Sequence, residues 1–152
     1  MFRFTTARSL VGWVMFACLV CGAGQVHSAE GPVAGSKIHR VVMHVNSGDE
    51  KVQKGILNNI TNLYDAVGAE RLTVELVAHG AGLSLFTTHD TKLAEELARL
   101  KTSYGVEYTA CSNTMKAQGL TRADLIDQVD RTMPAMVRLM ELQEQGWAYI
   151  KP

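Results

Sequence analysis

Apolar residues from position 37 onward follow two spacings in turn. Runs of β-branched and apolar residues over 38–45, 72–79 and 106–111 predict strands, and 147–150 predicts a short last strand. Between the runs, apolar residues recur every three or four positions, which predicts amphipathic helices. Such an alternation predicts an α/β fold with a mostly parallel sheet covered by helices on both faces.

Local signals bound the first two predicted helices. Ser47 and Glu50 have the spacing of a capping box at the start of the first helix, and Gly68 follows its end. Thr88 or Asp90 could cap the second helix. The expected buried faces consist of Val52, Ile56, Ile60, Leu63 and Val67 in the first helix, and of Leu93, Leu97, Leu100 and Tyr104 in the second.

The C-terminal part is less regular. A short helix is expected over 112–118, a capping-type start at Thr121–Asp124, and a short polar strand near Val129. Pro134 suits the first turn of a last helix. The expected apolar side of that helix consists of Met136, Val137, Leu139, Met140 and Leu142.

The N-terminus resembles a secretory signal peptide. Two arginines and no acid precede an apolar stretch over 10–20, and small and polar residues follow it. At about eleven residues this stretch is shorter than the roughly 20 that span a bilayer. We therefore expect a signal peptide over 1–28, a flexible lead-in over 29–36, a domain over 37–152 and a periplasmic location.

Two alternatives remain for this leader. Cys21 follows the apolar stretch, as the lipid-bearing cysteine of a lipoprotein would, although bulky Val20 precedes it. Retention of the leader as an uncleaved anchor is the other alternative.

Composition excludes some partners. Removal of 1–28 leaves 13 Lys and Arg against 15 Asp and Glu, a net charge of −2. That balance gives no basic patch of the kind that nucleic-acid binding needs. Neither G-x-G-x-x-G nor a phosphate-loop Lys-Ser/Thr pair follows Gly80-Ala81-Gly82, so we expect no nucleotide cofactor.

Three residues with reactive side chains fall near the carboxyl ends of the predicted strands. His44 is near the end of the first strand, His79 ends the second and Cys111 ends the third. Ligands and catalysis gather at this edge of an open parallel sheet. Cys111 would be the one cysteine of the exported chain, so its thiol is free, paired between molecules, or reactive.

A helix start after Cys111, with Lys116 nearby, could stabilise its thiolate. The structural alternative is a small buried apolar residue. A metal site of His44, His79 and Cys111 is a further alternative, since two imidazoles and a thiolate can bind zinc or copper. The methionine stripe of Met133, Met136 and Met140 is more typical of a core or an interface than of a metal site.

These segments, taken in order, resemble the DsrE/DsrF-like family over nearly the whole expected mature chain. The matching pieces are Val41–Asp49, Leu57–Asn59 with Asn62-Leu63, Val77–Gly80 with Gly82-Leu83, Ala110–Thr114 and Gln145–Pro152.

The resemblance implies a three-layer α/β/α domain with a parallel sheet of about five strands, and homo-oligomers, commonly trimers or hexamers. Better-known relatives are sulfur-relay proteins, in which a cysteine after the third strand carries a persulfide. Cys111 lies at the corresponding place, and His44, His79 and Asn113 would line its pocket.

Two features depart from the family pattern. Asp130 and Arg131 are polar where relatives have an apolar strand, which suggests an exposed edge. The relay relatives act in the cytoplasm, whereas this chain carries an export-like leader, so the usual relay partners would be absent.

The leading hypothesis is a persulfide carrier on Cys111 that exchanges sulfur with a donor and an acceptor. Such a protein carries sulfur more than it turns over a substrate, so the sequence leaves open whether it is an enzyme. A non-catalytic oligomeric binding or assembly module is the other reading.

Overall fold

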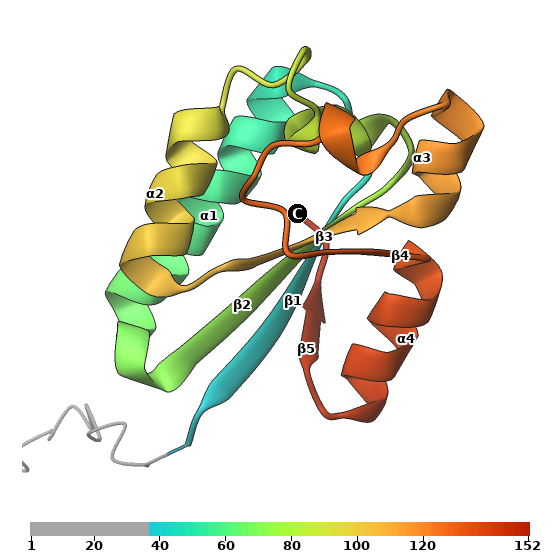
Figure 1. Ribbon diagram of the computed structural model, residues 1–152. Coiled ribbons are helices and arrows are strands. Elements are labelled where there is room, and N and C mark those ends of the chain that lie inside the picture. The colour runs from blue at the N-terminus through green and yellow to red at the C-terminus, as the bar shows by residue number, and fades with distance from the viewer. Residues whose placement is uncertain (1–36) are drawn as a thin grey trace, which may run out of the picture. The chain divides into compact units, whose positions relative to one another are not determined.

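A computed structural model describes residues 37–152, so the leader expected over 1–28 and the lead-in over 29–36 lie outside the described residues. Five strands form one all-parallel sheet in the order β4-β3-β2-β1-β5 (Figure 1). The strands are β1 (His39–Val45), β2 (Leu72–Ala78), β3 (Glu107–Cys111), β4 (Arg131–Met133) and β5 (Ala148–Ile150).

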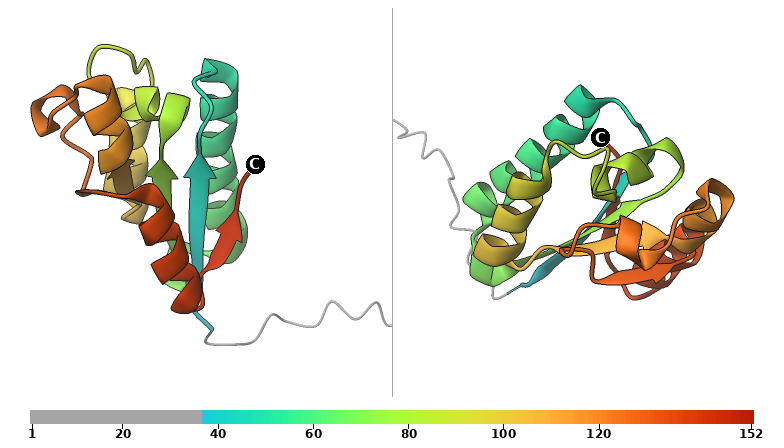
Figure 2. Two further views of the ribbon diagram at one scale, coloured as in Figure 1. Left: turned by 90° about the vertical axis from the view of Figure 1, so that its right-hand side faces the viewer. Right: turned by 45° about the horizontal axis from the view of Figure 1, so that its top comes forward.

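Helices cover both faces of the sheet, which confirms the predicted three-layer α/β/α fold (Figure 2). Helices α1 and α2 pack on one face, and α4 packs on the other. The helices are α1 (Glu50–Val67), α2 (Ala94–Tyr104), α3 (Ser112–Gln118) and α4 (Ala135–Glu144), with short 3-10 helices η1 (Ala69–Arg71), η2 (Gly80–Phe86) and η3 (Arg122–Asp124). No helix of the described part is both long and apolar enough to cross a membrane.

The two faces of the sheet differ in polarity. Alternate residues of a strand point to opposite faces, and the α1/α2 face carries the larger, apolar core. The α4 face mixes apolar residues with buried polar ones. Its buried residues are Val42, His44, Glu75, Val77, Thr109 and Cys111 from the strands and Ala135, Leu139 and Leu142 from α4.

The start of α1 differs from the prediction. Asp49 caps the helix, and its carboxylate accepts hydrogen bonds from the backbone N–H groups of Lys51 (2.7 Å) and Val52 (3.2 Å). The Ser47 hydroxyl instead accepts from the N–H of Asp49 at 3.2 Å. The capping box expected between Ser47 and Glu50 is therefore wrong, because a carboxylate closer to the helix start takes those donors.

The cap predicted for α2 at Thr88 or Asp90 is also wrong. The helix begins at Ala94 without a side-chain cap, whereas the Asp90 carboxylate accepts a hydrogen bond from the Thr87 hydroxyl at 2.7 Å. Farther on, Asp124 accepts a hydrogen bond from the N–H of Thr121 at 2.7 Å, as the capping signal there predicted.

Strand β4 lies two residues beyond the weak prediction near Val129, at one edge of the sheet. Arg131 is half-buried and Thr132 is exposed, which agrees with the exposed edge that the polar sequence suggested.

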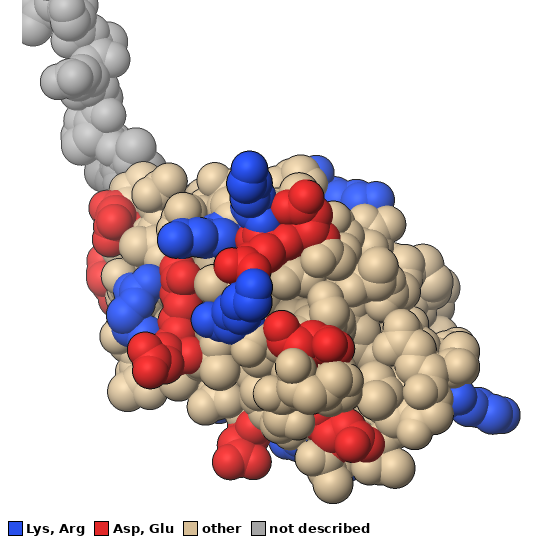
Figure 3. All heavy atoms as spheres, turned by 90° about the horizontal axis from the view of Figure 1, so that it is seen from above, with Lys and Arg blue, Asp and Glu red and all other residues tan. Residues whose placement is uncertain are grey.

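Viewed from above, Lys and Arg side chains intermingle with Asp and Glu on the visible face (Figure 3).

Two predicted helix faces need correction. Val52 is 41% exposed, and Gln53 takes the buried position, where its amide donates to the Ser47 carbonyl and the Ser84 hydroxyl. In α4, Leu139 and Leu142 are buried together with Ala135. The remaining apolar side chains of that helix are exposed: Met136, Val137 and Met140.

Candidate functional site

Cys111 ends β3 and directly precedes α3. Its side chain is on the α4 face, packed with Val42, Val77 and Ala135, and the residue is 6% exposed. It is the one free cysteine among residues 37–152. The thiol is thus nearly covered, as the structural alternative expected, but polar groups also reach its sulfur.

The Cys111 sulfur accepts a hydrogen bond, and further donors influence its pKa. The Ala135 N–H, at the start of α4, donates to Sγ at 3.4 Å. Burial by itself would raise the pKa of the Cys111 thiol, but the Thr114 hydroxyl and three backbone N–H groups outweigh it and lower that pKa. These backbone donors belong to Ala135, Thr114 and Asn113.

Thr114 connects the thiol to the end of the neighbouring strand. Its Oγ1 accepts a hydrogen bond from the Gly80 N–H at 2.9 Å. Because that bond uses an oxygen lone pair, the hydroxyl proton stays free to donate to Cys111. The turn after β2 therefore orients the group that stabilises the thiolate.

His44 and His79 stack on each other, with ring centroids 4.7 Å apart. His44 is 6% exposed, and its Nδ1 is 2.7 Å from the Tyr149 hydroxyl of β5. Its Nε2 is buried and has no hydrogen-bond partner among the described residues. His79 is half-buried.

Both imidazoles stay neutral over a wide pH range. Burial, helped by His79 and the Lys151 ammonium, lowers the pKa of His44 to about 4. Burial and Lys151 also lower the pKa of His79. The pair can therefore accept or donate a hydrogen bond near neutral pH without bearing charge.

Strand register relates the histidines to the thiol. Val45, Ala78 and Ala110 pair in register across β1, β2 and β3. His79 and Cys111 each follow one of these paired residues, so they lie at the same level on neighbouring strands. His44 precedes this level and reaches it through its stack on His79.

Asn113 and Lys116 do not act on the thiol through their side chains as the sequence suggested. Asn113 has an exposed side chain and reaches the thiol through its backbone N–H. Lys116 is exposed in the last turn of α3, and the main contributions that lower the Cys111 pKa come from hydrogen-bond donors. No group of three or more His, Cys, Asp or Glu residues within 37–152 is arranged to hold a metal ion, so the His/Cys metal alternative has no support there.

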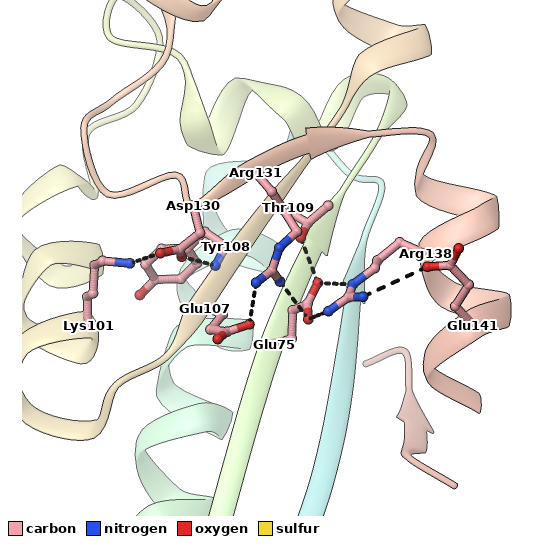
Figure 4. Close-up of polar contacts among 9 residues, drawn as sticks. All are labelled: Glu75, Lys101, Glu107, Tyr108, Thr109, Asp130, Arg131, Arg138 and Glu141. Atoms are coloured by element: carbon pink, nitrogen blue, oxygen red, sulfur yellow. Dashed lines mark hydrogen bonds and ion pairs between the residues drawn. The ribbon is translucent and has the colours of Figure 1, made fainter. Parts of the chain in front are cut away.

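Sequence reasoning missed a buried ion cluster on the same face (Figure 4). Glu75, in the middle of β2, is fully buried and accepts hydrogen bonds from Arg138 Nε at 2.8 Å and Nη2 at 2.6 Å. The Thr109 hydroxyl donates to it at 2.6 Å, and Arg131 Nη1 is 3.0 Å away. The sequence signal for this cluster was Glu75, a single acid in an otherwise apolar central strand. A buried carboxylate there needs a cationic partner.

This cluster positions α4 over the thiol. Burial favours a raised pKa for Glu75, but the hydrogen bonds from Arg138 and Thr109 and the nearby arginine charges hold that pKa below its usual range. Glu75 therefore stays ionised and binds Arg138. Since Ala135 begins the same helix, the pairing also fixes the N–H that donates to Cys111.

Several solved structures have a similar fold, among them the following two. The protein of unknown function MTH1491 from Methanobacterium thermoautotrophicum is 30% identical, with a TM-score of 0.70, over 75% of this chain and 99% of that one. The ychN protein from E. coli is 13% identical, with a TM-score of 0.59, over 76% and 99%, and this likeness concerns the fold alone.

No curated protein matches the chain. The model of the DsrE/DsrF-like family matches residues 37–152, all of the part that the structure describes. The protein therefore belongs to the DsrE/DsrF-like family.

Proposed function

We propose that this protein carries sulfane sulfur as a persulfide on Cys111. The observation that carries the proposal is the Ala135 N–H, which donates to the buried Cys111 sulfur at 3.4 Å, beside Asn113 and Thr114, whose donors also lower the thiol pKa. These groups stabilise a sulfur anion where burial alone would favour the neutral thiol. A cysteine that serves only as an apolar core residue does not need hydrogen-bond donors at its sulfur.

The proposed chemistry is a pair of balanced exchanges. The Cys111 thiolate attacks the outer sulfur of a donor persulfide, a new S–S bond forms, the donor S–S bond breaks, and the donor leaves as a thiolate. An acceptor thiolate then attacks the outer sulfur of the Cys111 persulfide and releases the Cys111 thiolate. Neither step changes the total number of electrons, so no oxidant or reductant is needed.

Access to the sulfur requires a local movement. Cys111 is 6% exposed, and Ala135 at the start of α4 contacts its sulfur. In the proposal this segment shifts when a donor docks. The neutral imidazole of His79, which stacks on His44, then orients the donor by hydrogen bonding.

We place this activity in the periplasm, in a trimer or hexamer, on the strength of the leader pattern over 1–28 and of the family resemblance. The sulfur donor and acceptor would then be periplasmic thiol compounds or proteins. Size-exclusion chromatography with light scattering, and fractionation of cells expressing the full chain, test these two parts separately.

The loading experiment is direct. Protein lacking residues 1–28 is incubated with polysulfide, and its intact mass is measured beside that of the Cys111→Ser variant. The proposal expects one added sulfur atom, removable by a reducing thiol, on the parent protein and none on the variant. A parent protein that stays unmodified while an authentic carrier loads would refute the proposal.

A non-catalytic assembly module is the second candidate. It is favoured by the exposed apolar side chains of α4 and β5, which are 40–56% exposed. This reading expects Cys111→Ser to leave partner binding and function unchanged. These side chains are Met136, Val137, Met140 and Tyr149.

A further inference from the structure

A hollow of about 420 Å³ opens between α4 and the β1–β5 edge of the α4 face. His44 lines it from β1 and Tyr149 from β5. Met136 and Met140, four residues apart on one side of α4, line it from the opposite wall. Cys111 is not among its lining residues, so the hollow is separate from the thiol.

The imidazole of His44 has a spare nitrogen. Its Nε2 is buried without a hydrogen-bond partner in the described part of the chain, although buried polar atoms are rarely left unpaired. Its Nδ1 is within hydrogen-bond distance of the Tyr149 hydroxyl at 2.7 Å. Histidines that bind metals show this arrangement, in which an oxygen accepts from one ring nitrogen and the other nitrogen faces the metal.

The two methionines complete a soft donor set. Met136 is 56% exposed and Met140 51% exposed, so their flexible thioethers can turn toward the hollow at little packing cost. Thioether sulfur selects soft monovalent copper over hard cations, and imidazole is also a good copper ligand. The third methionine of the stripe, Met133, is in β4 and does not line the hollow.

We propose that His44, Met136 and Met140 form a binding site for one Cu(I) ion. The ligands are His44 Nε2 and the two Sδ atoms, and Tyr149 holds the imidazole by accepting from Nδ1–H. Binding involves no electron transfer and displaces no proton from the neutral ring. The proposal goes beyond sulfur carriage and does not depend on the Cys111 thiol.

Because a thiolate also binds Cu(I), the test uses the Cys111→Ser background. Protein lacking residues 1–28 is titrated anaerobically with Cu(I) against a chromogenic copper chelator. The site predicts one Cu(I) per chain, with sulfur and nitrogen neighbours in X-ray absorption spectra. Met136→Leu/Met140→Leu should weaken binding by more than about tenfold, and Met133→Leu should leave it unchanged.

Either of two results would overturn the site: absence of stoichiometric Cu(I) on the Cys111→Ser protein, or equal affinity in the double methionine variant. A second copy of the chain covering these side chains would also appear as absence of binding. Since Met136 and Met140 are exposed, leucine there preserves the fold, which thermal unfolding checks. Sulfur loading of the otherwise unchanged chain measures the proposed function separately.

Discussion

Glu75 and Arg138 form a bidentate ion pair across 63 residues of sequence, between the middle of a central strand and the helix above it. The carboxylate is fully buried, and the side chain of Arg138 is 17% exposed. Such a pair contributes little net stability over an apolar pair of the same size, but it is costly to break, because the remaining charge stays buried. It therefore specifies where α4 sits, and with it the Ala135 N–H at the Cys111 sulfur.

Replacement of Arg138 by Met should lower the free energy of unfolding by about 2 kcal/mol, since Glu75 keeps Arg131 but loses both bonds of the guanidinium. Urea unfolding measures the change. Arg99→Met, which breaks an exposed contact to Glu96 at 3.7 Å, is the control and should cost less than about 0.5 kcal/mol. Equal costs for the two variants would contradict the assigned role of the pair.

Replacement of Thr114 by Val should raise the pKa of the Cys111 thiol, because the hydroxyl that lowers this pKa is lost. A titration of the thiolate by its ultraviolet absorbance measures this value. Thr114→Ser keeps the hydroxyl and should retain a value near that of the parent protein. If valine and serine behave alike, Thr114 does not stabilise the anion.

Acid should destabilise the protein through His44. The pKa of its imidazole is about 4 in the folded chain and 6.5 in the unfolded chain, so protonation favours unfolding. The contribution of the neutral ring is complete above pH 6.5 and is lost as the pH falls toward 4, at a cost of about 3 kcal/mol. Glu75, whose pKa is also lowered, acts in the same direction at lower pH.

Urea unfolding between pH 7 and pH 4 checks the contribution of His44. His44→Gln should show a clearly smaller loss of stability over this range than the parent protein. His89→Gln, at an exposed residue, is the matched control and should follow the parent curve. A His44→Gln curve parallel to that of the parent would exclude the imidazole as the cause.

Gly82 should not tolerate a side chain. A Cβ there would be 2.6 Å from the Val45 carbonyl oxygen and 2.8 Å from the Asn46 Cα, so η2 would have to move away from the end of β1. We expect Gly82→Ala to cost about 2 kcal/mol in thermal or urea unfolding. Gly55→Ala, in α1 with open space around it, is the control and should be neutral or stabilising. A neutral Gly82→Ala would show that η2 and the end of β1 are not tightly packed at Gly82.

The sequence predicted β1, β2 and β3 to within one residue at each end, because fully buried parallel strands appear as nearly continuous apolar runs. Short β4 lacks such a run and was placed two residues early. The exposed side of α4 was missed because Met136 and Met140 follow the same periodicity as the buried Leu139. Periodicity identifies an apolar face without saying what covers it.

The site was only partly predictable, because its polar contacts join distant segments. Residue types and strand ends pointed to Cys111, His44 and His79, but no local pattern revealed that Thr114 bonds the Gly80 N–H 34 residues earlier. The stack of His44 on His79 depends on strand order and register, which the sequence did not provide.

Sulfur carriage on Cys111 can be followed with one labelled sulfur atom. A persulfide donor carrying isotopically labelled sulfane sulfur is mixed with the protein, the chain is digested, and the Cys111 peptide is analysed before and after an acceptor thiol is added. Sulfur carriage on Cys111 predicts that the label appears on Cys111, leaves for the acceptor, and is never found on Cys111→Ser. Label reaching the acceptor at the same rate with Cys111→Ser, or never bound at Cys111, would contradict it.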